Sequence, residues 1–465
     1  MGVSRQMLVL GFSNVLFMAA YLALKITVSL YFSPQGLTEA YAIATGSSAL
    51  FAVNALIFSA LSRRYFSHRL LLTWGLLLNT LAFLCFLSSR LDWQLLGVAL
   101  WVVGSGMYVV NFNIMINKMF DADIPRQHAN HLRKLEMELG GIVGVVIVAI
   151  LLYRSGYNAL YLVCGGCMLA SLLSLLSYYF GLYHEPPHVT PHWHWLRERH
   201  AKYLAYSAPA AVLLMDYVLL LHEPLTRYLL ISIFIILYSG IIVKAILARK
   251  SHYLSFLCLI TLVSLIYWLA VTTLYNQFNV FLVNDVSSTV FGWHVPPLAM
   301  LVFDSVSGLV FGSMITLYYA KYPIKSATKL QLGIFLIALA YGLLVLGLYL
   351  RPAGALLNVG WAFAMICIMA IAMFFISPTL VAMVNQLIKR DEPREFFTGM
   401  LQMVSAFIIV VAYYFFKMVI PRQGMNNVDA ACHLGSYLYT GIALAAIVSG
   451  ILLYSLKRLG IIRTC

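Results

Sequence analysis

The first long apolar segment of the chain is MLVLGFSNVLFMAAYLALKITVSLYF, residues 7–32. A helix that crosses a lipid bilayer needs about 20 apolar residues, and this segment is long enough. Lys25 lies about midway along it, where a charge in lipid costs at least a few kcal/mol. Such a charge is usually kept where it faces a polar cavity with a ligand to bind. The segment, with Tyr21 one turn before Lys25, therefore indicates a substrate pathway; the simpler alternative is a lysine that extends to the membrane surface.

The rest of the chain has the same character. Hydrophobic residues make up 62% and charged residues 10% of the sequence, whereas a soluble domain has about 45–50% and about 25%. Apolar runs of spanning length follow one another, and we expect about fourteen transmembrane helices. The expected spans are 7–32, 38–61, 70–89, 94–117, 134–153, 158–182, 204–221, 226–247, 252–283, 295–320, 328–350, 357–387, 395–419 and 434–456. The first is too long for the core of a removable signal peptide, so we expect none.

The net charge of +14 follows the same topology. If the N-terminus is cytoplasmic, most lysines and arginines fall on the inner side of the membrane, as the positive-inside rule requires. The outer side holds Arg90, Arg154, Arg227, Arg351, Lys417 and Arg422. The positive charge is therefore explained without a nucleic-acid partner.

The spans group as six, two and six. We expect a six-helix bundle over residues 1–182, a cytoplasmic linker with an inserted two-helix hairpin over 183–251, and a second six-helix bundle over 252–465. Two such halves around a central cavity are the plan of major-facilitator transporters. Gly140, Gly141 and Gly144 form a small-residue patch, which indicates close packing between helices.

Motifs of enzymes and nucleotide-binding proteins are missing from the sequence. It contains no Walker motif, no G-x-G-x-x-G after a strand and no H-E-x-x-H. The linker histidines His188, His192 and His194 match no standard zinc spacing, and a solvated linker is the simpler interpretation. We therefore expect no enzyme activity, no cofactor and no metal site.

Several motifs together resemble the proton-dependent oligopeptide transporters of the major facilitator superfamily. They are GSGMYVVNFN at 104–113 with DADIPR at 121–126, LGG at 139–141, YWLA at 267–270, ISPTLVAMV at 376–384 and RYFSHR at 64–69. The resemblance covers almost the whole chain, and the extra helix pair is the arrangement of bacterial members. It implies an all-α, major-facilitator fold in the bacterial inner membrane, with both termini in the cytoplasm and proton-driven transport of di- and tripeptides.

The chain departs from this family at most of its charged positions. The glutamate and arginine positions of the first helix fall on Phe17 and Met18, and an arginine that binds the peptide C-terminus falls on Lys25. The remaining replacements are Thr272 and Met373 for glutamates, Val109 for a lysine, Asp304 for an asparagine and Arg63 for a loop acid. Thr, Met and Phe do not titrate, so the usual proton relay is not present residue for residue.

The candidate substrate-binding residues are Lys25, Tyr21, Asn111, Asn113, Thr272, Asn276 and Asp304. Lys25 could hold a carboxylate as a point charge, and Asp304, about ten residues into span 295–320, could hold an amine; together they could clamp a zwitterion. Asp304 and Glu138 are the candidates for proton coupling. Lys134 and Glu138, four residues apart, form an inner gate or merely a solvated helix end.

The sequence thus predicts a monomeric secondary transporter that moves a short peptide or peptide-like solute by alternating access. Its expected partners are that solute, the lipid bilayer and protons. Two alternatives remain open: transport of a non-peptide metabolite such as a metallophore, and a receptor-like relative that transports nothing.

Overall fold

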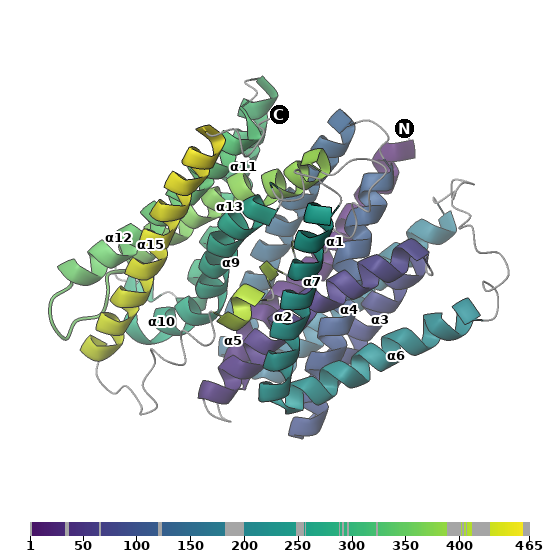
Figure 1. Cartoon of the computed structure of the whole chain (residues 1–465). Helices are drawn as coiled ribbons and strands as arrows, with labels where there is room; N and C mark the ends of the chain where they lie inside the picture. The colour runs from purple at the N-terminus through teal and green to yellow at the C-terminus, as the bar shows by residue number, and fades with distance from the viewer. Residues whose placement is uncertain are drawn as a thin grey trace. The chain divides into compact units, whose positions relative to one another are not determined.

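The computed structural model is nearly all-helical (Figure 1). It describes residues 2–32, 37–64, 67–119, 123–181, 200–247, 255, 257–287, 289–290, 293–294, 297–321, 324–387, 401, 404–405, 407–411 and 428–458. The predicted fold class, an all-α membrane protein of the major-facilitator type, is confirmed. The linker histidines and most of the expected span 395–419 lie outside the described residues.

The chain forms two compact units. Unit 1 comprises Met1–Tyr31 and Gly46–Leu229, and unit 2 comprises Phe32–Thr45 and Leu230–Cys465. The helices in or entering unit 1 are α1 (Gly2–Tyr31), α2 (Leu37–Arg64), α3 (His68–Phe86), α4 (Leu91–Met119), α5 (Asp123–Gly181) and α6 (His200–Leu221). The next helix, α7 (Glu223–Leu247), begins in unit 1 and continues in unit 2.

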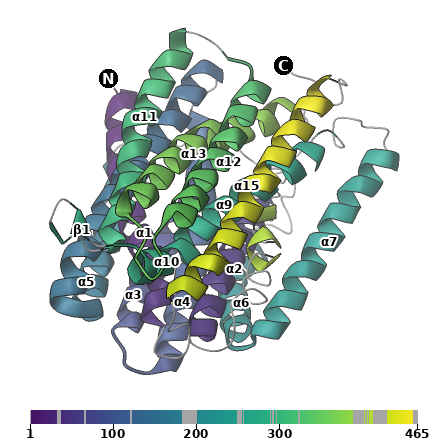
Figure 2. The same cartoon turned by 90° about the vertical axis from the view of Figure 1, so that its left-hand side faces the viewer.

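Unit 2 contains the remaining elements. These are the π-helical turns η2 (Ile260–Ser264) and η3 (Thr273–Gln277), α9 (Leu265–Thr272), α10 (Phe278–Asp285), β1 (Thr289–Val290), β2 (Trp293–His294), the 3-10 turn η4 (Pro297–Leu301), α11 (Val302–Lys321), α12 (Ser326–Leu350), α13 (Val359–Leu387) and α15 (Val428–Arg458). β1 and β2 form a short antiparallel pair. α12 and α15 lie side by side (Figure 2).

Among the described residues, ten helices are long and apolar enough to cross a membrane. Three shorter apolar helices, Ile43–Ser59, Ser207–Leu221 and Ala299–Ile315, coincide with expected spans. Thirteen of the expected segments therefore have an apolar helix, and the other, 395–419, lies mostly outside the described residues. The chain is a multi-pass membrane protein.

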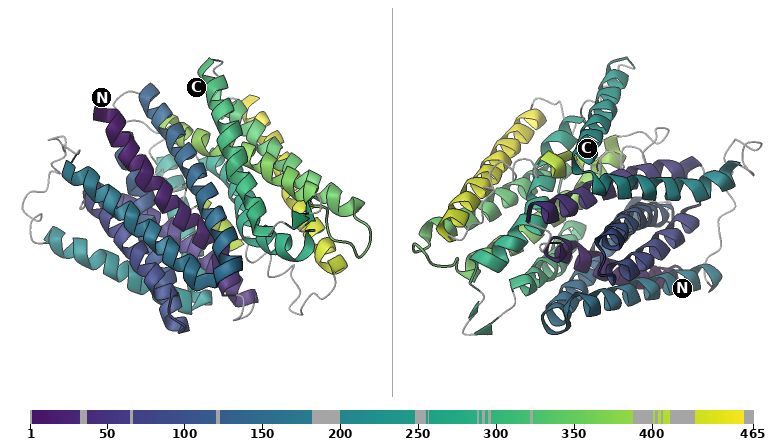
Figure 3. Two further views of the ribbon diagram at one scale, coloured as in Figure 1. Left: turned by 180° about the vertical axis from the view of Figure 1, so that it is seen from behind. Right: turned by 90° about the horizontal axis from the view of Figure 1, so that it is seen from below.

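Unit 1 is held together by close packing of α1 against α5 (Figure 3). Gly156 has φ 77° and ψ −174°, a conformation that suits glycine, and it kinks α5 near the start of the second of its two apolar spans, which are Leu132–Leu152 and Arg154–Tyr179. The first of these approaches α1 through glycines: a Cβ on Gly140 would lie 2.7 Å from the Met18 Cβ, and one on Gly144 would lie 2.4 Å from the Ala19 oxygen. The sequence prediction of a small-residue contact is thus confirmed.

An aromatic cluster completes the core of unit 1. Tyr31, Phe86 and Tyr161 have ring centroids 5.1–6.2 Å apart and come from α1, α3 and α5. The Tyr31 hydroxyl also donates a 3.0 Å hydrogen bond to the Phe86 carbonyl. The cluster buries large apolar side chains where three helices meet, which favours their association by packing.

α6 and α7, which the sequence predicts as an inserted hairpin, are divided between the two units. Asp216 of α6 is fully buried and accepts a 2.5 Å hydrogen bond from the Asn54 amide of α2, inside unit 1. In unit 2, Phe234 of α7 stacks on Phe407 with ring centroids 4.0 Å apart. The predicted boundaries 1–182, 183–251 and 252–465 remain a prediction.

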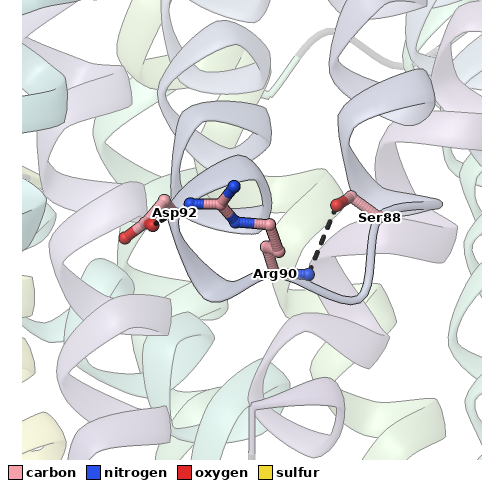
Figure 4. A network of polar contacts seen from close by, with 3 residues as sticks. All are labelled: Ser88, Arg90 and Asp92. Atoms are coloured by element: carbon pink, nitrogen blue, oxygen red, sulfur yellow. Dashed lines mark hydrogen bonds and ion pairs between the residues drawn. The ribbon is translucent and has the colours of Figure 1, made fainter.

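Polar contacts also order the loops between the helices. At the turn between α3 and α4, Arg90 and Asp92 form an exposed ion pair at 3.5 Å, and the Arg90 amide donates to the Ser88 hydroxyl (Figure 4). An exposed pair of this kind stabilises little, typically less than about 1 kcal/mol. In unit 2, backbone bonds of 2.9 Å join Leu357 to Asp285 and to Ser287, which fixes the loop after α10 against the loop before α13.

Candidate functional site

One face of α1 carries Phe17, Tyr21 and Lys25, which are four residues apart and therefore lie above one another. Tyr21 contacts Phe51 of α2 and Trp101 of α4, with ring centroids 5.8 and 5.4 Å away. Lys25 is half-buried one turn further along the helix. The predicted residues Tyr21 and Lys25 thus share a face, and aromatic rings surround one end of it.

Apolar packing has replaced the acid that the resemblance expects on α1. Phe17 is fully buried, and its ring lies 4.1 Å from that of Tyr108 on α4. Within the described part of the chain, the buried Trp101 Nε1 has no hydrogen-bond partner. This indole donor beside Tyr21 is available to a water or a ligand, because buried polar groups usually find partners.

The two predicted asparagines of α4 differ in their surroundings. Asn111 is buried; its amide donates to the Met107 carbonyl at 2.8 Å, and its Oδ1 lies 3.0 Å from the His68 Nδ1 of α3. The Asn113 Oδ1 has no hydrogen-bond partner among the described residues. The Asn113 Oδ1 can therefore accept a further hydrogen bond, whereas the Asn111 Oδ1 is used in the contact that joins α4 to α3.

Lys134 and Glu138 form an ion pair of 2.5 Å along α5. Both side chains are mostly buried, so the pair is not the solvated helix end considered from the sequence. Their predicted part in gating or proton coupling stays a prediction.

A further acidic side chain, Glu136, lies against α1. Its Oε2 accepts a 3.0 Å hydrogen bond from the Asn14 amide. Its Oε1 would lie only 2.6 Å from a Cβ placed on Gly11. The sequence analysis gave Glu136 no role; a signal for it was Gly11 and Asn14, three residues apart on α1.

In unit 2, the predicted residues of the expected span 252–283 fall on irregular helix. Thr272 is buried at the end of α9, and the turn η3 that follows is π-helical, a feature frequent at functional sites. Asn276 belongs to η3, but its side chain lies outside the described residues. The Thr273 hydroxyl donates to the Leu269 carbonyl at 2.8 Å, so its hydrogen-bond partner lies within its own helix.

Asp304 is buried and accepts a 2.5 Å hydrogen bond from the Tyr275 hydroxyl of η3. The expectation that it lies about ten residues into a helix is wrong: Pro297 begins the 3-10 turn η4, and Asp304 is in the first turn of α11. A helix N-terminus stabilises negative charge. The Asp304 carboxylate thus has a hydroxyl donor and a favourable dipole, which suits an anion that binds a cationic group.

Metal-binding side chains do not gather in the described part of the chain: no three of His, Cys, Asp and Glu lie close enough there to hold an ion. Among the described residues, unit 1 contributes the half-buried cation Lys25 on α1, and unit 2 contributes the buried carboxylate Asp304 on α11.

Comparison with known proteins gives the family. The sequence profile of the Major Facilitator Superfamily matches residues 6–413. No curated protein matches the chain. Among solved structures, a peptide transporter in complex with alafosfalin is 16% identical, with a TM-score of 0.79 over 97% of this chain and 94% of that one. The tetrameric transporter PepTSo2 is 14% identical, with a TM-score of 0.82 over 99% of each chain.

A transporter of the POT family in complex with 5-aminolevulinic acid is also similar, at 16% identity and a TM-score of 0.81 over 98% of this chain and 96% of that one. At these identities the similar structures establish the fold, which this chain shares with those transporters. The profile covers most of the chain and agrees with the fold. The chain therefore belongs to the Major Facilitator Superfamily of membrane transporters.

Proposed function

We propose that the protein is a secondary transporter of the proton-dependent oligopeptide type, which moves a small peptide or peptide-like solute by alternating access. The observation that carries this proposal is the charged residue Lys25, half-buried within the apolar span Met7–Tyr31 and next to the aromatic contacts of Tyr21. A cation at this depth is costly unless it serves a ligand or a partner. The overall match to peptide-transporter structures supports the same solute class.

Lys25 and Asp304 have complementary parts in this proposal. Lys25 binds the carboxylate of the solute, and Asp304, which Tyr275 holds by a hydrogen bond, binds its amine. Tyr21, Asn113 and Thr272 complete the binding residues, with Asn111 and Asn276 as the other predicted members. The ammonium of Lys25 is a point charge and selects ligand geometry less strictly than a guanidinium does.

A second candidate solute is a zwitterionic metabolite that is not a peptide. Where the family resemblance expects acids, this chain has the buried apolar residues Phe17 and Met373. Such residues cannot bind the amino terminus of a peptide by charge, and one similar transporter structure holds 5-aminolevulinic acid. We propose a location in the bacterial inner membrane with both termini in the cytoplasm, and the monomer as the functional unit.

The test is uptake into proteoliposomes that contain the purified full-length chain. Radiolabelled dialanine, trialanine and 5-aminolevulinic acid are offered with and without an inward pH gradient. The proposal predicts uptake of at least one solute, faster with the gradient, and its loss in Lys25→Ala. If wild-type protein moves none of the solutes but binds one tightly, the receptor-like alternative replaces the carrier.

A further inference from the structure

The contact between α1 and α5 contains a carboxylate that neither the proposed binding residues nor the fold accounts for. Both oxygens of Glu136 face one turn of α1: Oε2 accepts from the Asn14 amide at 3.0 Å, and Oε1 occupies the notch that Gly11 leaves. Gly11 and Asn14 are three residues apart and share a helix face. The carboxylate is thus fitted to α1 rather than directed to solvent.

Glu136 differs from Glu138, its neighbour on α5. Glu138 is paired with Lys134 of its own helix at 2.5 Å, and the two partners move together whenever α5 moves. In the described part of the chain, Glu136 has no cation within ion-pair distance, and its hydrogen-bond partner is a neutral amide on another helix. A change of charge on Glu136 therefore acts directly on the contact between the two helices, whereas a change on Glu138 breaks a pair within one helix.

The groups around Glu136 are few. Among the described residues, the charged group that faces it is the Arg133 guanidinium, one turn earlier on α5, and the titratable group is the Tyr108 hydroxyl of α4. From α1 it meets only the Asn14 amide and the Gly11 backbone, and α3 adds no charged group among the described residues. Arg133 itself makes a 3.8 Å contact with the Met137 sulfur rather than an ion pair. Among the described side chains, Glu136 therefore has no fixed counter-ion on another helix when it gains or loses a proton.

We propose that Glu136 is the coupling carboxylate of this transporter: it carries the proton that accompanies the solute, and its charge sets how tightly α1 is held to α5. The inference rests on the proposed transport function. When ionised, Glu136 accepts a charge-assisted bond from Asn14, about twice as strong as the bond that a neutral acid accepts. When protonated, it accepts only the weaker neutral bond and holds α1 less tightly. Lys25 lies eleven residues after Asn14 on α1, about 16 Å of helix rise, so α1 connects the solute site and the proton site as one rigid element.

The test compares two modes of transport in proteoliposomes with dialanine and 5-aminolevulinic acid as probes. Gradient-driven accumulation needs the proton, whereas exchange of labelled for unlabelled solute without a gradient does not. For Glu136→Gln we expect accumulation to fall by about tenfold or more, a common size for coupling between two sites, while exchange is kept. Asp92→Asn, which removes an exposed carboxylate paired with Arg90, is the matched control and leaves both modes unchanged.

Two further variants separate coupling from mere support of the fold. Asn14→Asp combined with Glu136→Gln returns a carboxylate to the same contact from the opposite helix, and we expect it to restore accumulation. Gly11→Ala keeps the charge but displaces the Glu136 carboxylate, because its Cβ would lie 2.6 Å from Oε1, and we expect weaker accumulation. Wild-type accumulation in Glu136→Gln overturns the inference, as does loss of both modes that the double variant fails to restore. Absence of exchange in the wild type overturns the proposed function instead.

Discussion

Replacement of Gly144 by alanine should loosen the contact between α1 and α5. The added Cβ would lie 2.4 Å from the Ala19 oxygen and 3.2 Å from the Ala19 carbonyl carbon, both backbone atoms that cannot turn aside. Ordinary contacts of a Cβ are 3.4–4 Å, so the two helices must separate locally by about 1 Å. Overpacking of this size typically costs about 1–3 kcal/mol of unfolding free energy, which lowers the melting temperature by a few °C.

The measurement is thermal unfolding of purified protein in detergent micelles, followed by tryptophan fluorescence. Gly166→Ala is the control, because Gly166 is on the same long helix α5 and has no atom within 4 Å of the position its Cβ would take. Both substitutions bring the same gain in helix propensity, so the difference between them isolates the packing contact. Equal melting temperatures for Gly144→Ala and Gly166→Ala would show that the glycine contact between α1 and α5 is not present as described.

Three other outcomes are expected. Burial raises the pKa of Asp285 to about 6, so the folded state keeps a proton that the unfolded state releases near pH 4. The free energy of unfolding should therefore decrease as the pH rises from 4 to 6, by no more than about 1 kcal/mol. Asp285→Asn should remove this dependence of the melting temperature on pH. Asp304→Asn should weaken solute binding about tenfold or more, and Tyr275→Phe by less, since the hydroxyl only positions the carboxylate; calorimetric affinities that match the wild type would refute both roles. Asp216→Leu strands the buried Asn54 amide and should cost about 1–3 kcal/mol, which Asn54→Leu in the same chain should partly restore in a double-mutant cycle.

Hydropathy was sufficient for the architecture because each span must be apolar over a length set by the bilayer. The glycines of α5 likewise predicted a close helix contact, which the structure places against α1 at Gly140 and Gly144. Periodicity could not name the partner helix, since a small-residue face fits any helix that approaches it. The pairing of Glu136 with Asn14 depends on that partner and was missed for this reason.

Irregular helix was also beyond the sequence pattern. The position of Asp304 was misjudged because an apolar run does not show where the 3-10 turn that Pro297 begins ends and where α11 begins. The π-helical turn η3 brings Tyr275 to Asp304, yet nothing in its sequence, Thr-Leu-Tyr-Asn-Gln, indicates a π-helical turn. Such contacts between distant segments depend on tertiary packing and not on local propensity.

Recognition of the solute carboxylate by Lys25 is the central claim, and a competition assay tests it most directly. Unlabelled dialanine and its C-terminal amide compete with the labelled solute for uptake by wild-type protein and by Lys25→Ala. The account predicts that the acid competes with the wild type at least about tenfold better than the amide, as loss of a charge-assisted contact implies, and that the preference disappears in Lys25→Ala. An amide that competes as well as the acid with the wild type would contradict the account.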